Sequence, residues 1–434
     1  MTIHTCAGAT PTRAAWAVPL ALLLAATPAP ADDLFAGHDT LDRAALIEAV
    51  LERNQTVAAA RQGWQALGAM PSQAGALDDP MIGYAFAPRS IGASDVRYGQ
   101  IIDFSQSIPF FGKRSLRAAA ARAEAEAARE DLEAVRREIA LMASMLFDDY
   151  YTIERSLEIN AEHDTLLEEL MASARAKYVA GETAQHVLLT IEIELAHVDH
   201  DDVILGSERE IIRARLNALL HRPPDASLPA PGPKVAILPG AEATYDSRAS
   251  LESRPEVAAA RARVLAAERS ASLARREYLP DLTVGVEYND MWDMPEHRLM
   301  TGIAINVPLQ LGRRKAAVDE AEARLLQRKS EEAVVVDQLL AEITTAQERA
   351  REAHHVLELY RQRLVPAARD RVASVRAGFE VGRSELETLI ETDRKLRDIE
   401  LAGEIALADL NRRTAELDRA VGRMPGLDSY EVPK

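Results

Sequence analysis

The segment LERNQTVAAAR at residues 51–61 recurs about 200 residues later as LESRPEVAAAR at residues 251–261. Two further pairs follow in the same order. IPFFGKR at 108–114 corresponds to VPLQLGRR at 307–314, and SARAKYVAG at 173–181 corresponds to SVRAGFEVG at 374–382. Ordered matches at one shared offset are the signature of an internal repeat. The chain is therefore predicted to consist of two copies of one structural unit.

A proline-rich stretch separates the two copies. Six prolines fall between Arg222 and Gly240, so this stretch cannot be the interior of a helix. We expect a first repeat at 32–221, a linker at 222–247, a second repeat at 248–423 and a C-terminal tail at 424–434. Each repeat reads as a helix, two strands, a very long helix, a glycine turn and a second long helix.

The long segments carry apolar residues at three- and four-residue spacing. The clearest examples are Leu132, Val135, Ile139 and Met142 in the first half, and Leu339, Ile343, Ala346 and Ala350 in the second. This spacing predicts coiled-coil seams. Neither Gly nor Pro occurs from Lys113 to Ala180, which permits a rod approaching ~100 Å. Pro366 interrupts the matching rod, so a kink or short break is expected there.

Two stretches before each long helix alternate between apolar and polar side chains. The apolar positions are Ile82, Tyr84 and Phe86, then Ile102 and Phe104, in the first half; and Leu282, Val284, Val286 and Tyr288, then Ile303, Ile305 and Val307, in the second. Strands of roughly 8–11 residues with one apolar face suit a tilted membrane strand. A soluble sheet with one buried face shows the same alternation. Such a sheet needs a layer packed upon it, whereas the flanking rods direct their seams at other helices.

Composition and the N-terminal residues narrow the class of protein. The chain has 434 residues, is 5% aromatic and carries a net charge of −17, which argues against a nucleic-acid binder. Arg13, the apolar run at 14–26 and the small residues at 29–31 predict a secretory leader at residues 1–31. The sole cysteine, Cys6, precedes that run, so neither a disulfide nor a lipid anchor is expected. Beyond Ala31 no apolar stretch is long enough for a transmembrane helix.

Four strands per chain leave two possibilities open. In a membrane, four strands cannot close a barrel, which needs at least about eight. An open edge in lipid would leave backbone N–H and C=O groups without partners. The membrane interpretation therefore requires an obligate homo-oligomer whose copies share one barrel. The alternative is a soluble periplasmic coiled-coil adaptor or scaffold protein with a small sheet.

The arrangement resembles the TolC-like outer-membrane efflux family over nearly the whole mature chain. The resemblance rests on the two VAAAR segments, Asp79-Pro80, Pro280-Asp281, residues 109–114, residues 308–314, Leu364-Val365-Pro366, and residues 378–383 with Leu386 and Leu389. It implies a mainly α fold with a small β part. Three chains would form a twelve-stranded barrel on a periplasmic α-helical tunnel in the outer membrane of a Gram-negative bacterium.

The same resemblance implies a function and partners. Such proteins are passive exit ducts, docked through a periplasmic adaptor protein to an inner-membrane pump. The sequence holds no phosphate-cradling loop, HExxH motif or nucleophile elbow, and carboxylates scattered along rods would enclose no pocket, so neither a cofactor nor enzymatic activity is expected. The Pro-Phe-Phe-Gly-Lys-Arg form resembles the heavy-metal-exporting branch and favours metal-ion export. A drug or another small molecule stays open as the cargo.

The resemblance also supplies candidate gate residues. The family closes its tunnel with rings of carboxylates, and alignment on Gly382 places those rings at Thr388 and Glu391. Thr388 is not an acid, so Glu387, one turn before Glu391 on the same helix face, is the expected replacement. In a trimer each inward carboxylate becomes a ring of three that attracts cations. The alternative is that both glutamates are solvated acids near a helix start.

The glycine turns are candidate adaptor contacts, with Tyr178 beside Gly181 and Phe379 beside Gly382. The alternative is that the glycines only permit the turns and that each aromatic packs against the neighbouring hairpin.

One further pattern has metal-ligand spacing. His197, His200 and Asp201 lie at i, i+3 and i+4, which would suit zinc or copper. A solvated stretch on an acidic helix is the favoured interpretation, so no metal site is predicted.

Overall fold

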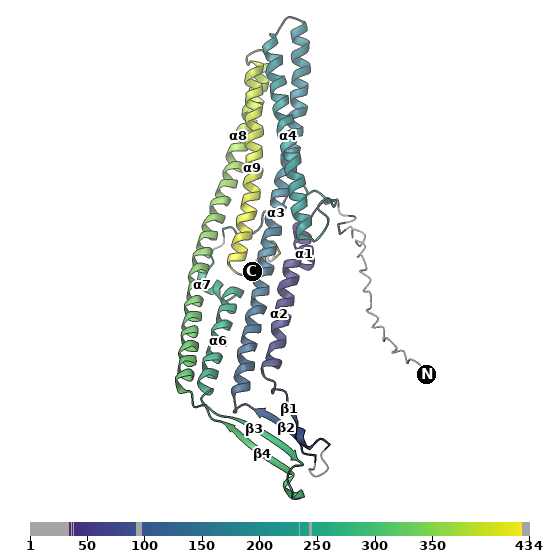
Figure 1. The fold of residues 1–434 in the computed structure, drawn as a ribbon. Coiled ribbons are helices and arrows are strands. Elements are labelled where there is room, and N and C mark those ends of the chain that lie inside the picture. The colour runs from purple at the N-terminus through teal and green to yellow at the C-terminus, as the bar shows by residue number, and fades with distance from the viewer. Residues whose placement is uncertain are drawn as a thin grey trace, which may run out of the picture.

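The computed structural model describes residues 34–427, apart from residues 36, 38, 93–97, 234 and 243–244. The predicted leader at 1–31 and residues 428–434 of the predicted tail lie outside the described residues. Long helices run side by side along most of the molecule, and a small sheet lies at one end of them (Figure 1).

The described residues of the first half of the chain contain four α-helices and two strands. In order they are α1 (Arg43–Arg53), α2 (Gln55–Ala74), β1 (Met81–Phe86), β2 (Gln100–Ile108), α3 (Lys113–Val179) and α4 (Gln185–Leu219). A single 3₁₀ turn, η1 (Pro88–Ser90), follows β1.

The second half repeats this order with one additional break. It contains α5 (Ser247–Leu251), α6 (Pro255–Arg276), β3 (Asp281–Asn289), η2 (Pro295–His297), β4 (Leu299–Asn306), α7 (Leu311–Leu359), η3 (Tyr360–Leu364), α8 (Val365–Glu380) and α9 (Leu386–Ala420). The predicted order of helix, two strands, long helix, turn and long helix is confirmed in both halves.

The rod predicted from the absence of Gly and Pro is the helix α3. It has 67 residues, which at 1.5 Å per residue gives about 100 Å. Gly112 precedes it with a φ of 87°, in the left-handed region that favours glycine. A Cβ at this position would also collide with the guanidinium of Arg276. The rod therefore begins where the sequence has a glycine, and it ends just before the next one, Gly181.

The matching rod of the second half is broken where the proline predicts a break. The α-helix α7 ends at Leu359, five residues form the π-helical segment η3, and α8 resumes at Val365. Pro366 lies in the first turn of α8 and has no N–H to donate to the preceding turn. The mismatch is absorbed by the π segment, a recurrent cause of helix kinks.

The helix seams are built from aliphatic side chains and many alanines. One core joins α1, α3 and α4, with Leu46, Ile47 and Leu216 fully buried. A second joins α7 and α9 through Ile343, Ala350 and other small or aliphatic residues. Alanine at the seam lets helix axes approach closely, because its side chain ends at Cβ. This explains how a chain with few aromatics still buries hydrophobic cores along its helices.

The proline-rich segment between the halves is tied to the second half by side-chain amides. Asn411 of α9 accepts a hydrogen bond from the backbone N–H of Leu238 at 2.9 Å, and its amide donates to the carbonyl of Ala236 at 3.2 Å. Asn411 and Leu238 are both buried. A segment without regular structure thus has its buried backbone groups satisfied.

The four strands form one antiparallel sheet in the order β1-β2-β3-β4. The central pairing, β2 with β3, joins the two halves of the chain. The register places Tyr84 opposite Ile102, Ile102 opposite Tyr288, and Leu282 opposite Ile305. The predicted apolar positions that lie within the strands therefore share one face; Val307 lies just beyond the end of β4. The strands have 6, 9, 9 and 8 residues, so β1 is shorter than the predicted 8–11.

The apolar face of the sheet is uncovered. Ile82 is 77% exposed and Ile303 is 74% exposed, and their neighbours on this face, including Phe104 and Ile305, are exposed as well. The sheet hangs beyond the ends of the helices in Figure 1 rather than packing under them. A soluble sheet with one buried face, which the alternation also permitted, is not what this chain forms.

Among the described residues, no helix combines the length and apolar character needed to cross a membrane.

Candidate channel and assembly surfaces

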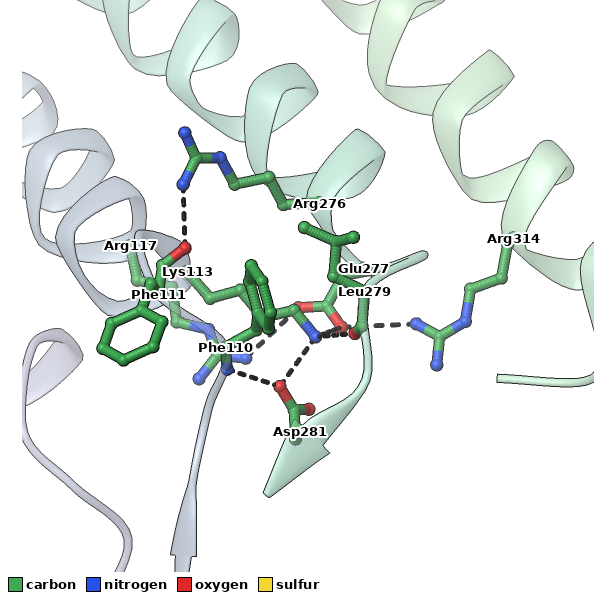
Figure 2. A network of polar contacts seen from close by, with 9 residues as sticks. All are labelled: Phe110, Phe111, Lys113, Arg117, Arg276, Glu277, Leu279, Asp281 and Arg314. Atoms are coloured by element: carbon green, nitrogen blue, oxygen red, sulfur yellow. Dashed lines mark hydrogen bonds and ion pairs between the residues drawn. The ribbon is translucent and has the colours of Figure 1, made fainter. Parts of the chain in front are cut away.

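The sheet is fixed to the helices by a buried lysine at the point where β2 leads into α3 (Figure 2). Lys113 is only 1% exposed. Its Nζ donates hydrogen bonds to the carbonyl oxygen of Leu279 and to Oδ1 of Asp281, both at 2.8 Å, and lies 3.3 Å from Oε2 of Glu277. One ammonium from the first half thus holds the α6–β3 connection of the second half.

Other charges complete this junction around Glu277. Its carboxylate lies 3.3 Å from Arg117 of α3 and 3.2 Å from Arg314 of α7. The backbone N–H of Phe110 donates to Asp281 at 2.8 Å, and Arg276 donates to the carbonyl of Phe111 at 2.8 Å (Figure 2). Three helices and two strands therefore converge on two carboxylates. The sequence singled out residues 109–114 as a motif, but no local signal indicates that Lys113 reaches residues more than 160 positions away.

The two faces of the sheet differ in chemistry. Opposite the apolar face lie Asp103, Ser105, Thr283 and Glu287, which border an open hollow of about 480 Å³. A sheet with one polar and one apolar face can separate water from lipid. Each outer strand, β1 and β4, is hydrogen-bonded to one neighbouring strand only within the described part of the chain.

The two helical hairpins turn at the end of the molecule opposite the sheet (Figure 1). Gly181 has a φ of 77° and Gly382 a φ of 72°, so both turns use the left-handed conformation. Tyr178 is 44% exposed. Phe379 is partly buried, and the Nζ of Lys177 lies 4.4 Å from the centre of its ring. Of the two aromatics, Phe379 contacts the neighbouring hairpin, as the alternative interpretation expected, and Tyr178 presents its ring to solvent.

The three gate candidates lie on one side of the first turns of α9. Glu387, Thr388 and Glu391 are exposed, whereas Leu389 and Ile390 between them are buried. The structure thus brings the two glutamates onto one solvent-facing stripe. This placement fits a carboxylate ring and solvated acids equally, so the gate stays a prediction.

A buried histidine–aspartate contact and an exposed ion pair tie the two hairpins together. The Nδ1 of His163 in α3 lies 2.6 Å from Oδ2 of Asp393 in α9, and both side chains are less than a tenth exposed. The Nε2 of His163 is buried without a hydrogen-bond partner. On the surface, Arg394 of α9 lies 3.1 Å from Glu194 of α4. Sequence reasoning missed the His163–Asp393 pair, because its members are 230 positions apart and neither belongs to a motif.

Two adjacent tyrosines of α3, Tyr150 and Tyr151, are buried. Burial, with Glu154 next in importance, raises the pKa of Tyr150 to about 12. Burial likewise raises the pKa of Tyr151, whose hydroxyl donates to Glu404 of α9 at 2.7 Å. Both phenols therefore stay neutral hydrogen-bond donors at physiological pH, consistent with structural roles in the helix seam.

The histidine pattern on α4 is not assembled as a metal site. His197 and His200 are exposed, and Asp201 lies 3.5 Å from both Arg397 and His200. No group of three or more His, Cys, Asp or Glu side chains that could hold a metal ion occurs in the part of the chain that the structure describes.

The fold of this chain is shared with solved structures of bacterial outer-membrane proteins and channels. The chain superposes on CusC with a TM-score of 0.75 and 16% identity, covering 88% of this chain and 92% of CusC. The values for the outer membrane protein VceC from Vibrio cholerae are 0.73, 18%, 88% and 96%. Those for the open state of the Neisseria gonorrhoeae MtrE outer membrane channel are 0.74, 17%, 89% and 90%. At these identities the likeness establishes the fold.

Residues 247–423, which span the second repeat, match the family described as outer membrane efflux protein. The fold shared with CusC and VceC extends over 88% of the chain and so includes both repeats. No curated protein sequence matches the chain.

Proposed function

We propose that the chain is a subunit of an outer-membrane efflux channel, a passive exit duct for substrates that an inner-membrane pump delivers through a periplasmic adaptor. The observation that carries this proposal is the uncovered apolar face of a four-stranded sheet suspended from helical rods of about 100 Å. The family of residues 247–423 and the channel folds named above support it. The soluble adaptor is disfavoured, because a soluble sheet would bury its apolar face.

The proposed assembly is a homotrimer. One chain offers two open strand edges, and unpaired backbone groups have no partners in lipid. Three chains would supply twelve strands, enough to close a barrel, and the polar face with Asp103 and Glu287 would line its lumen. The rods of the three chains would continue the barrel as a tunnel through the periplasm.

At the far end of the rods we place the gate and the adaptor contacts. Glu387 and Glu391, with Thr388 between them, would form acidic rings that favour cations. The turns at Gly181 and Gly382, with Tyr178 and Phe379 beside them, would meet the adaptor. Metal ions are the favoured cargo, on the Pro-Phe-Phe-Gly-Lys-Arg resemblance; among the described residues no metal-holding cluster supports this choice.

Fractionation and conductance test the proposal together. The protein should sediment with outer membranes, stay oligomeric in mild detergent and conduct ions in planar bilayers. Deleting Leu282 to Val307 should abolish membrane insertion, because it removes β4 and nearly all of β3. Release of the intact protein by osmotic shock as a water-soluble monomer would contradict the proposal.

A further inference from the structure

Within the sheet, the two repeats of one chain meet at one seam, where β2 of the first repeat pairs with β3 of the second. The opposite seam would join β4 of the second repeat to β1 of a first repeat. In this chain these two strands lie at opposite edges of the sheet. The partner that would complete the seam is therefore a second copy of the chain, if the proposed assembly holds.

One contact inside each repeat joins comparable elements, although its acceptor is a backbone carbonyl in the first repeat and a carboxylate in the second. Arg114, in the first turn of α3, donates to the carbonyl of Gly75, the residue that caps the C-terminus of α2, at 2.7 and 2.8 Å. Arg314, in the first turn of α7, lies 3.2 Å from Glu277, the residue that caps α6. Each long helix thus starts against the end of the short helix of its own repeat. This equivalence justifies transferring other contacts from one repeat to the other.

The contact that Lys113 makes between the repeats has no counterpart made by the second repeat within the described part of the chain. Lys113, directly after Gly112, binds the α6–β3 connection. Its equivalent, Arg313, directly follows Gly312, is exposed, and has no polar partner among the residues described here. The equivalent acceptor segment, between α2 and β1, carries Asp78 and Asp79. Both are exposed, and neither carboxylate has an ion-pair partner within the described ranges. An exposed cation and two exposed carboxylates thus lie in the corresponding segments, with Asp78 and Asp79 at the places of Tyr278 and Leu279 when Pro80 is aligned with Pro280.

We propose that Arg313 of one copy pairs with the carboxylates of Asp78 and Asp79 of the next copy, and that β4 of the first copy pairs antiparallel with β1 of the second. This inference rests on the proposed oligomeric channel and specifies its seam. The arginine replaces the lysine of the internal seam, and its longer side chain suits a position one residue further from the strand. That extra residue is visible in VPLQLGRR as compared with IPFFGKR.

The internal seam also fixes the register of the external one. Within the chain Gln106 lies opposite Val284, and Phe104 lies opposite Val286. Aligning Pro109 with Pro308 gives the residue of β4 that corresponds to each residue of β2. Aligning Pro80 with Pro280 gives the residue of β1 that corresponds to each residue of β3. Transferred by these shifts, the pairs become Ile305 opposite Tyr84 and Ile303 opposite Phe86. The next pair along is Val307 opposite Ile82.

The transferred register keeps the faces of the sheet consistent. Ile303, Ile305, Tyr84 and Phe86 all lie on the apolar face of the single chain. A slip of one residue would place Ile305 opposite Ala85, which lies on the polar face, and would invert one strand relative to the other. The register was obtained from the prolines alone, so this agreement is an independent check.

Engineered cysteine pairs test the register in the full-length protein with Cys6 replaced by serine. Tyr84→Cys with Ile305→Cys should form intermolecular disulfides in outer membranes, seen as covalent dimers and trimers on non-reducing gels. Directly opposed strand residues have Cβ atoms close enough to be bridged. Two matched controls, Ala85→Cys with Ile305→Cys and Ile82→Cys with Ile305→Cys, should cross-link at least about tenfold less, since their Cβ atoms would be on opposite faces or diagonal.

Charge exchange tests the ion pair. Arg313→Glu should lower the ratio of oligomer to monomer in detergent about tenfold, because it places like charges together at the seam. Combining Arg313→Glu with Asp79→Arg should recover most of the oligomer. Arg371→Glu, an exposed charge reversal on α8, is the control and should leave the ratio unchanged.

The outcomes separate this inference from the proposed function. If the wild-type protein is oligomeric and conducts ions but a control cysteine pair cross-links best, the proposed register between copies is wrong and the proposed channel function is supported. The same conclusion about the ion pair follows if Arg313→Glu and Arg371→Glu behave alike. If the wild-type protein is a soluble monomer, the proposed function fails before the seam is tested.

Discussion

Replacing Lys113 with methionine removes the ammonium that joins the two repeats while keeping most of the side-chain volume. The Nζ makes two hydrogen bonds of 2.8 Å and one ion pair of 3.3 Å in a site where the lysine is almost fully buried. Methionine leaves the carbonyl of Leu279 and the carboxylate of Asp281 without this donor. Glu277 keeps Arg117 and Arg314. The lost hydrogen bonds are therefore those at the start of β3.

The size of the effect follows from burial. Breaking a buried ion pair costs about 3–5 kcal/mol. Here the carboxylates of Glu277 and Asp281 are 26% and 27% exposed, so water recovers part of that loss. We expect Lys113→Met to lower the free energy of unfolding by about 2–3 kcal/mol.

The assay is urea unfolding of the detergent-solubilised protein, followed by far-ultraviolet circular dichroism. Arg117→Met is the matched control: it removes a cation from the same carboxylate cluster, but the pair is 3.3 Å long and the arginine is 38% exposed. An exposed pair of this kind contributes less than about 1 kcal/mol. Equal losses in Lys113→Met and Arg117→Met would refute the view that burial of the lysine makes this junction strong.

Three further perturbations test other parts of the molecule. Replacing both Glu387 and Glu391 with alanine should weaken cation selectivity or raise the leak in planar bilayers, and unchanged currents would remove the gate assignment. His163→Phe should lower the free energy of unfolding by about 3 kcal/mol, since Asp393 stays buried and loses its partner. Adding Asp393→Leu should restore most of that free energy. A further loss of stability in the double variant would contradict this explanation. Although burial alone raises it, the Arg254 guanidinium holds the pKa of Glu256 below its ordinary value of 4.5. Stability from this pair is therefore present above about pH 4.5 and is lost as the pH falls through the lowered value. The difference in unfolding free energy between the wild type and Glu256→Gln should shrink on going from pH 7 to about pH 3, and a constant difference would show that the charge is not responsible.

Much of the fold was predictable because its signals are local. The duplicated VAAAR segments, the uninterrupted stretch after Lys113 and the alternation in Leu282–Tyr288 each depend on neighbours within a few turns or strand positions. Pro366 predicted the break because a missing N–H acts on the turn directly before it. The length of β1 was overestimated, since alternation alone does not show where pairing with β2 stops.

The candidate site was only partly predictable. The positions of Glu387, Glu391 and the glycine turns follow from spacing along one helix or turn, yet their roles and the repeat boundaries stay predictions. The contacts of Lys113 with Asp281 and of His163 with Asp393 had no counterpart in any motif.

The sequence by itself determined the internal duplication, the rods, the strands and their two faces, because periodicity places side chains on a helix or strand without reference to the rest of the chain. Only the tertiary structure decided which charges meet across the repeats and which edges of the sheet are left open. Those contacts join residues more than 160 positions apart, as with Lys113 and Asp281. Their geometry is set by how whole helices and strands pack against one another.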